Sequence, residues 1–218
     1  MTQLLVITKA PVPGRSKTRL TPPCTPEQAA AIAAASVGDT LDTVRATPVD
    51  RRVVALDGAP GDLDLSGLEV VPQVDGDLGT RLAAAFGEAM AGPHGDHPTL
   101  LIGMDTPQVS PALLSGCLDR LVEAGPGAAV LGVAPDGGWW ALGVHSPAAA
   151  QVLPDVPMSR DDTAVNTRAA LEGAGFTVLD LPELTDIDHF PDAVAVAELC
   201  PEGSRTRRVV GEIATGLG

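Results

Sequence analysis

The sequence predicts an α/β protein in which a mixed, mainly parallel sheet lies between helices on both of its faces. Three observations lead to this fold class. Short apolar runs alternate with longer helical patterns along the chain, as in doubly wound sheets. Several runs are apolar throughout, which is typical of parallel strands buried on both faces. A Pro-Asp-Gly-Gly turn at 135–138 joins two strand-like segments, so one strand is expected to run antiparallel.

The expected elements alternate in chain order. Strands are predicted at residues 3–8, 51–57, 68–73, 99–103, 128–134, 139–145 and 176–181. The first helix begins at Pro26, with Thr25 as its N-cap, and extends to about residue 46. Further helices are expected at about 78–91, 111–124, 161–174 and 191–199. We therefore expect one domain over residues 1–200 and a C-terminal tail over 201–218, either loosely attached or used in an oligomer contact.

Composition excludes several classes of function. Asp and Glu number 28 against 14 Lys and Arg, giving a net charge of −14, so the surface should repel nucleic acid and anionic membranes. The chain has no apolar run long enough to span a bilayer and no signal-peptide pattern, so a cytoplasmic protein is expected. Its three cysteines lack metal-ligand or disulfide spacing and are expected to be core thiols.

A basic loop follows the first predicted strand and holds both lysines of the chain. Its four cations are Lys9, Arg15, Lys17 and Arg19. Open α/β sheets bind ligands at the carboxyl ends of their strands, so this loop is expected to receive a polyphosphate. A P-loop is excluded because Pro11 and Ser16 replace the glycines it needs, and Val74 breaks a dinucleotide fingerprint near 76–79. The alternative is a solvated basic turn.

Carboxylates are expected at the same edge of the sheet. Asp105 follows a buried strand directly, and Asp186 and Asp188 flank Ile187 after the last strand. Alternation in extended chain would put both late aspartates on one face while Ile187 packs inward. Because Mg²⁺ is held by one or two carboxylates plus substrate phosphates, Asp105 and Asp188 would suffice as its protein ligands. The alternative for Asp105 is a turn cap before Pro107.

Two further stretches carry candidate binding residues. Residues 74–82 form a turn entering a helix, whose amides and Arg81 are placed to meet a ribose or phosphate, although a plain capping turn would have the same pattern. Residues 135–140 bring a carboxylate, two glycines and two tryptophans together, which suits a sugar or other polar acceptor. The alternative there is a hairpin turn whose tryptophans pack in the core.

At these residues the chain resembles the glycosyltransferase-A (GT-A) superfamily. It is most similar to a bacterial family of unassigned function often named for arsenosugar-biosynthesis glycosyltransferases. The motifs that carry the resemblance are KAPVPGRSKTRL, GDLGTRL, GMDTP, DGGWWALG and TDIDHFPD. The Lys-Thr-Arg-Leu loop and the late Asp-Ile-Asp also resemble phospholactate guanylyltransferases. The resemblance implies a Rossmann-like nucleotide-diphospho-sugar transferase fold with a nucleotide in the N-terminal half.

The resemblance also assigns roles to individual residues. The implied catalytic residues are Asp105, Lys17 and Asp136, and the implied metal ligands for Mg²⁺ or Mn²⁺ are Asp105 and Asp188. The nucleotide-binding residues are Lys9, Gly14, Arg15, Lys17, Arg19, Asp77 and Arg81. The acceptor-binding residues are Gly137, Gly138, Trp139 and Trp140.

Three functions remain open at this point. The first is metal-dependent glycosyl transfer from a nucleotide-sugar to a small acceptor. The second is nucleotidyl transfer from a nucleoside triphosphate to a phosphorylated small molecule, with release of pyrophosphate. The third is a nucleotide-binding module without catalysis. The sequence does not identify the base or the sugar of the donor, the acceptor, or the oligomeric state.

Overall fold

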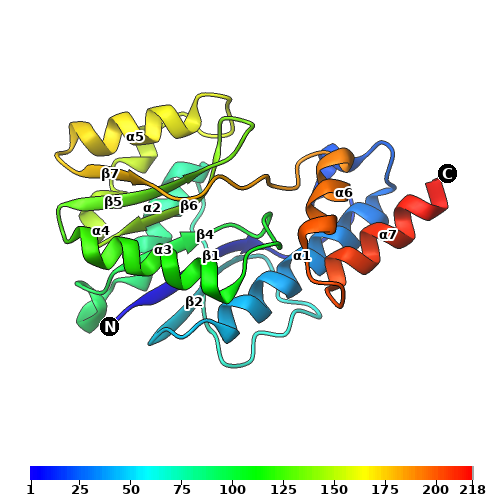
Figure 1. Ribbon diagram of the computed structural model, residues 1–218, viewed down its shortest axis with the longest axis horizontal. Helices are drawn as coiled ribbons and strands as arrows, with labels where there is room; N and C mark the ends of the chain where they lie inside the picture. Colours follow the sequence, from blue (N-terminus) through cyan, green and yellow to red (C-terminus); the bar gives the residue numbers. More distant parts are fainter. Residues whose placement is uncertain (218) are drawn as a thin grey trace.

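A seven-stranded sheet forms the centre of the computed structural model, which describes residues 1–217 (Figure 1). The strands are β1 (Gln3–Lys9), β2 (Arg51–Asp57), β3 (Glu69–Pro72), β4 (Thr99–Ile102), β5 (Ala128–Val133), β6 (Trp139–Val144) and β7 (Thr177–Asp180). Their order is β3-β2-β1-β4-β6-β5-β7, and within the described residues β6 alone runs antiparallel to its neighbours. The predicted mixed, mainly parallel sheet is confirmed.

Helices cover both faces of the sheet. The α-helices are α1 (Pro26–Ala46), α2 (Leu78–Ala89), α3 (Pro111–Ala124), α4 (Pro147–Ala150), α5 (Thr163–Gly173), α6 (Phe190–Leu199) and α7 (Arg205–Leu217). Short 3-10 turns are η1 (Thr18–Leu20), η2 (Gly92–His94) and η3 (Leu153–Asp155). One apolar cluster joins α1 and α3 to the sheet, and a second joins α2, α4 and α5 to the opposite face. The three-layer α/β/α arrangement is therefore confirmed.

The start of α1 illustrates why the local sequence was sufficient to place this helix. The Thr25 hydroxyl accepts from the backbone N–H of Gln28 at 3.2 Å, and the Gln28 side chain accepts from the Thr25 N–H at 2.8 Å. This reciprocal capping box satisfies two backbone donors that have no partner inside the helix. The predicted N-cap is confirmed.

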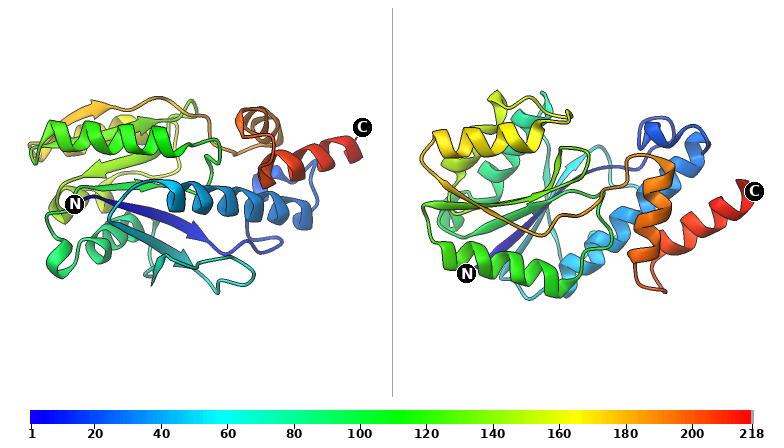
Figure 2. Two further views of the ribbon diagram at one scale, coloured as in Figure 1. Left: turned by 60° about the horizontal axis from the view of Figure 1, so that its bottom comes forward. Right: turned by 45° about the horizontal axis from the view of Figure 1, so that its top comes forward.

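The C-terminal segment forms helix α7, which is docked and not loosely attached, while the other alternative for this segment, an oligomer contact, stays a prediction. Asp39 of α1 accepts from the backbone N–H groups of Arg205 and Thr206 at 3.0 and 2.7 Å, so a carboxylate from another helix caps α7. Val210 and Ile213 of α7 are buried in a third apolar cluster shared with α6 and the first turns of α1. Figure 2 shows this helical pair beside α1, beyond the end of the sheet.

Burial also explains the cysteines, and the helices give no sign of a membrane span. Cys24, Cys117 and Cys200 are all buried free thiols, as predicted. Burial raises the pKa of Cys117 to about 11, partly offset by the charge of Arg120. Among residues 1–217, no helix combines the length and the hydropathy that crossing a membrane requires.

Candidate active site

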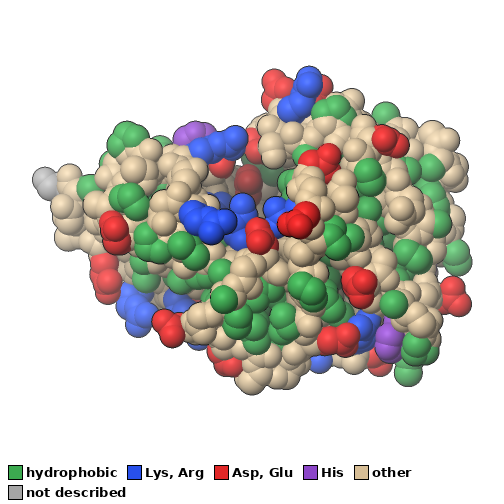
Figure 3. Space-filling model, turned by 180° about the vertical axis from the view of Figure 1, so that it is seen from behind, with side chains coloured by type: hydrophobic (Ala, Val, Ile, Leu, Met, Phe, Trp, Pro, Cys, Tyr) green, Lys and Arg blue, Asp and Glu red, His purple; other side chains and the backbone are tan. Residues whose placement is uncertain are grey.

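A cavity of about 620 Å³ opens at the carboxyl ends of β1 and β4. Figure 3 shows a hollow on this side of the molecule, with basic and acidic side chains around it. Its apolar lining includes Ile7, Leu82, Leu101 and Met158, which belong to the cluster on the α2 and α5 face or pack against it. The position agrees with the rule that open α/β sheets bind ligands beyond the carboxyl ends of their strands.

Three predicted nucleotide-binding cations line this cavity. Lys9 ends β1, and its side chain is exposed. Arg81 of α2 lies 2.7 Å from the Asp57 carboxylate at the end of β2, which fixes its direction. Arg19 lies 2.8 Å from Asp188. Lys9 and Arg81 therefore put positive charge beside β1 and β2, where a nucleotide's phosphates were expected.

Four other predicted nucleotide-binding residues do not line the cavity. Gly14 and Arg15 are exposed, because the loop turns back on itself where the N–H groups of Arg15 and Ser16 donate to the Val12 carbonyl. Asp77 caps α2 by accepting from the Thr80 N–H at 2.8 Å, so the plain capping turn is the correct interpretation of that aspartate. Lys17 is the fourth, and its side chain points inward.

The Lys17 ammonium contacts protein groups behind the cavity. Its side chain is 9% exposed, and Nζ lies 2.7 Å from Oδ1 of Asp105. The same ammonium donates to the carbonyl oxygen of Ile187. Direct contact of Lys17 with a phosphate, as expected from the sequence, is therefore not what this arrangement provides.

Residues 181–189 form a strap that leads from β7 to α6 across the carboxyl edge of the sheet (Figure 1). The Ile187 N–H donates to the Asp105 carbonyl at 2.8 Å, and the Gln108 side chain donates to the Thr185 carbonyl at 2.6 Å. Ile187 is fully buried, whereas Asp186 and Asp188 on either side of it both line the cavity. The predicted alternation along Asp-Ile-Asp is confirmed.

The strap brings Asp186 into a group of carboxylates with Asp105 and Asp136. The pKa of Asp186 is raised to about 6, chiefly by burial and then by the negative charges of Asp136 and Asp105, with the Lys17 charge opposing them. The sequence had not assigned Asp186 to the site, although the motif that singled out Asp188 also contains it. The carboxylate of Asp188 is engaged by Arg19 and lies 3.5 Å from Nδ1 of His189.

The donor set of this group fits a hard divalent cation. Carboxylate oxygens are the protein ligands that Mg²⁺ and Mn²⁺ prefer, and the repulsion felt by Asp186 is the kind that such a cation relieves. Among residues 1–217, no cluster of three or more His, Cys, Asp or Glu side chains is close enough to hold a metal without other ligands. In the part of the chain that is described, the carboxylates alone therefore do not complete a metal site.

The turn between β5 and β6 forms the opposite wall of the cavity. Asp136 accepts from the Gly138 N–H at 2.8 Å, and both residues line the cavity. Gly137 does not line it. It has a φ of +87°, and a Cβ there would lie 1.8 Å from the Asp161 carbonyl oxygen, so only glycine lets the 157–162 loop pack onto this turn.

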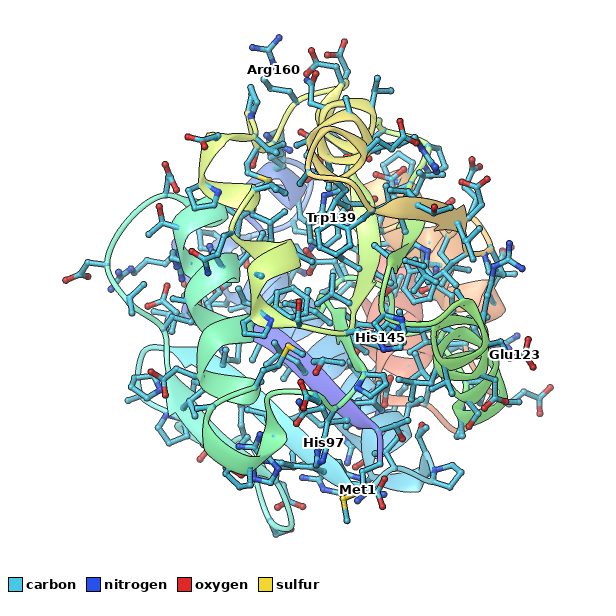
Figure 4. The ribbon with its side chains drawn as sticks, turned by 90° about the vertical axis from the view of Figure 1, so that its left-hand side faces the viewer. Met1, His97, Glu123, Trp139, His145 and Arg160 are labelled. Carbon is cyan, nitrogen blue, oxygen red and sulfur yellow. The ribbon has the colours of Figure 1, made fainter. Side chains whose placement is uncertain are left out.

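The two tryptophans have different environments. Trp140 is 3% exposed and donates from Nε1 to the Pro182 carbonyl at 2.9 Å, so its indole packs in the core although the residue also borders the cavity. Trp139 is partly buried, lines the cavity, and donates from Nε1 to the Thr167 hydroxyl of α5 at 3.1 Å. In Figure 4 Trp139 lies beneath α5, whereas Arg160 reaches outward.

Residues 40–160 match a family described as uncharacterized proteins conserved in bacteria (DUF2064). The chain belongs to this family. No curated protein matches the sequence significantly.

Solved structures with the same fold include several transferases. A provisionally assigned nucleotide-diphospho-sugar transferase from Desulfovibrio desulfuricans G20 is 24% identical, with a TM-score of 0.82 over 100% of this chain and 97% of that one. A nucleotidyl transferase from Methanothermobacter thermautotrophicus is 20% identical over 89% and 95% of the two chains, with a TM-score of 0.55. Rv0371c from Mycobacterium tuberculosis H37Rv, solved in complex with manganese, is 23% identical over 90% and 98%, with a TM-score of 0.51. These likenesses establish the nucleotide-diphospho-sugar transferase fold.

Proposed function

We propose that this protein is a metal-dependent transferase that moves a glycosyl group from a nucleotide-sugar to a small hydroxylated acceptor. The observation that carries the proposal is the separation of charge in one cavity. Lys9 and Arg81 stand beside β1 and β2, Asp105 follows β4, and Asp136 follows β5 on the other side of β4. This arrangement suits a donor that carries a diphosphate on one side and an acceptor without negative charge on the other.

The donor half suits a nucleoside diphosphate. Lys9 is exposed at the end of β1, and Arg81 is held in place by Asp57, so both can donate charge-assisted hydrogen bonds to phosphate oxygens. Asp105 and Asp186 would hold a Mg²⁺ or Mn²⁺ ion together with those oxygens, with Asp188 beside them. When bound, the cation supplies positive charge to the departing diphosphate.

The acceptor half separates glycosyl transfer from nucleotidyl transfer. Asp136 and Asp161 line this part of the cavity, and Arg160, which also lines it, is engaged by Asp162 at 3.0 Å. A carboxylate accepts hydrogen bonds from hydroxyl groups but repels phosphate. The phosphorylated acceptor that a guanylyltransferase-like reaction requires is therefore disfavoured, and the Asp136 carboxylate is placed to orient an acceptor hydroxyl.

The experiment that tests the proposal compares the two donor classes directly. Purified protein is incubated with Mn²⁺ and a panel of nucleotide-sugars, and in parallel with nucleoside triphosphates and phosphorylated acceptors. We expect release of a nucleoside diphosphate from at least one nucleotide-sugar, with the sugar transferred to water when no other acceptor is added, and we expect Asp136→Asn to reduce turnover more than donor affinity. Pyrophosphate release from a triphosphate, with no reaction of any nucleotide-sugar, would instead establish nucleotidyl transfer.

A further inference from the structure

Lys17 joins three segments that are far apart in the sequence. It lies in the loop after β1, contacts Asp105 after β4 through Oδ1 at 2.7 Å, and donates to the Ile187 carbonyl of the strap. With its side chain 9% exposed, the ammonium is almost fully withdrawn from water and approaches Asp105 from outside the cavity lining.

The backbone of Lys17 supports a specific role for this side chain. Its φ of 49° and ψ of 43° lie in the left-handed region, which residues with a Cβ adopt only at an energetic cost. Such a conformation persists where surrounding contacts determine it. The contacts that surround it here are those of the ammonium with Asp105 and Ile187 and the bond that the Leu20 N–H donates to the Lys17 carbonyl at 3.0 Å.

The ammonium also sets the charge that an incoming cation meets. Asp105 and Asp186 carry the oxygens that fit a divalent ion, and Lys17 is close enough to both for its charge to act on them. A fixed positive charge beside these carboxylates lowers their attraction for a second cation. The phosphates of a nucleotide add negative charge on the open side of the cavity and offset this effect.

We propose that Lys17 is a built-in counter-ion of Asp105. It holds the carboxylate and the strap in place when no metal is bound, and it makes tight binding of a divalent cation depend on a diphosphate. Lys17 is thus a positioning residue. This role depends on the proposed function at one point only, the assignment of the diphosphate to a nucleotide-sugar.

The first test measures Mn²⁺ affinity without nucleotide, by the electron paramagnetic resonance signal of free Mn²⁺. We expect weak binding to the wild-type protein and affinity about tenfold higher or more in Lys17→Met, which keeps the length of the side chain and removes the charge. Lys17→Gln, which keeps a hydrogen-bond donor for the Ile187 carbonyl, should show the same gain in affinity. It replaces Lys17→Met as the test variant if Lys17→Met does not fold. Lys17→Arg should stay as weak as the wild type.

Two controls connect the gain to Asp105. Arg15→Met removes a charge from the same loop, at an exposed position that does not line the cavity, and should change Mn²⁺ affinity less than about twofold. In an Asp105→Asn background, Lys17→Met should give a much smaller gain, because the paired carboxylate is gone and only Asp186 still feels the lost charge. A gain of undiminished size in that background would overturn the proposal.

The second test concerns the diphosphate, with inorganic pyrophosphate as a probe that carries no base. The melting temperature of the wild-type protein should rise with MnCl₂ plus pyrophosphate and stay unchanged with MnCl₂ alone, whereas that of Lys17→Met should rise with MnCl₂ alone. Equal or lower Mn²⁺ affinity in both uncharged variants overturns the counter-ion role. If the gain appears while no nucleotide-sugar reacts, the proposed function fails and the counter-ion role stands.

Discussion

Replacing Asp186 with Asn should stabilise the metal-free protein at neutral and alkaline pH. The pKa of this carboxyl is raised from its usual 3.8 to about 6, chiefly because it is buried and then because Asp136 and Asp105 carry like charge. Since one pKa unit corresponds to about 1.36 kcal/mol, ionising Asp186 in the folded protein costs at most about 3 kcal/mol, and less to the extent that solvent screens this partly buried side chain. Asn has nearly the same shape and never ionises.

The sign of this stability change depends on whether the folded or the unfolded state binds the Asp186 proton more tightly. The folded state has the higher pKa, so the stability that Asp186 contributes when protonated is fully present below pH 3.8 and is lost as the pH rises through about 6. We therefore expect Asp186→Asn to exceed the wild-type free energy of unfolding by up to about 3 kcal/mol at pH 8, with the difference shrinking toward pH 4.5.

Urea denaturation at pH 4.5, 6 and 8, monitored by circular dichroism, measures this difference. Asp119→Asn removes the same charge from an exposed position on α3 and is the matched control, for which we expect almost no change. A variant that is no more stable than the wild type at pH 8, or an advantage that does not change with pH, would refute the electrostatic reasoning. The same variant should gain less from Mn²⁺ with pyrophosphate than the wild type gains.

Three further predictions follow from individual residues. Lys9→Ala should weaken binding of a nucleoside diphosphate by about 1.5–3 kcal/mol in calorimetry, whereas Arg15→Ala, outside the cavity, should leave it unchanged. Gly79→Ala should lower the free energy of unfolding by about 1–3 kcal/mol, because its Cβ would lie 2.2 Å from the Leu153 carbonyl oxygen. Gly87→Ala, in the same helix with no atom within 4 Å of the added Cβ, should raise it by about 0.5–1 kcal/mol, and a loss there would contradict the packing argument. With a pKa of about 11, Cys117 should resist alkylation at pH 8 until denaturant is added, so fast labelling of the native protein would show that this thiol is not buried.

Local rules were sufficient for the elements of the sheet and for most helices. The apolar run at 3–8 is β1, Thr25 caps α1, and the turn at 135–138 reverses the chain into the antiparallel β6. Each of these features depends on residues that are neighbours in the sequence, through backbone propensity, capping and turn chemistry. The position of a site at the carboxyl ends of the strands followed from the same pattern, because parallel strands meet at one edge.

Contacts between distant segments decided the rest. The sequence predicted only a tail over 201–218, whereas in the folded chain the carboxylate of Asp39 and the apolar face of α6 provide the surface against which α7 docks. Adjacent tryptophans point to opposite faces of a strand, and only the folded chain shows that Trp139 and Trp140 both border the cavity while Trp140 is buried.

The charges in the site show the same limit most clearly. From the sequence, Lys17 is one of four cations in a basic loop, and all four have the same reason to meet a phosphate. In the folded chain the strap returns to the end of β4, which brings Ile187 and Asp105 onto the Lys17 ammonium and leaves Lys9 at the cavity. A side chain's partner is set by proximity in space, and segments 170 residues apart along the chain become neighbours only when the sheet is assembled.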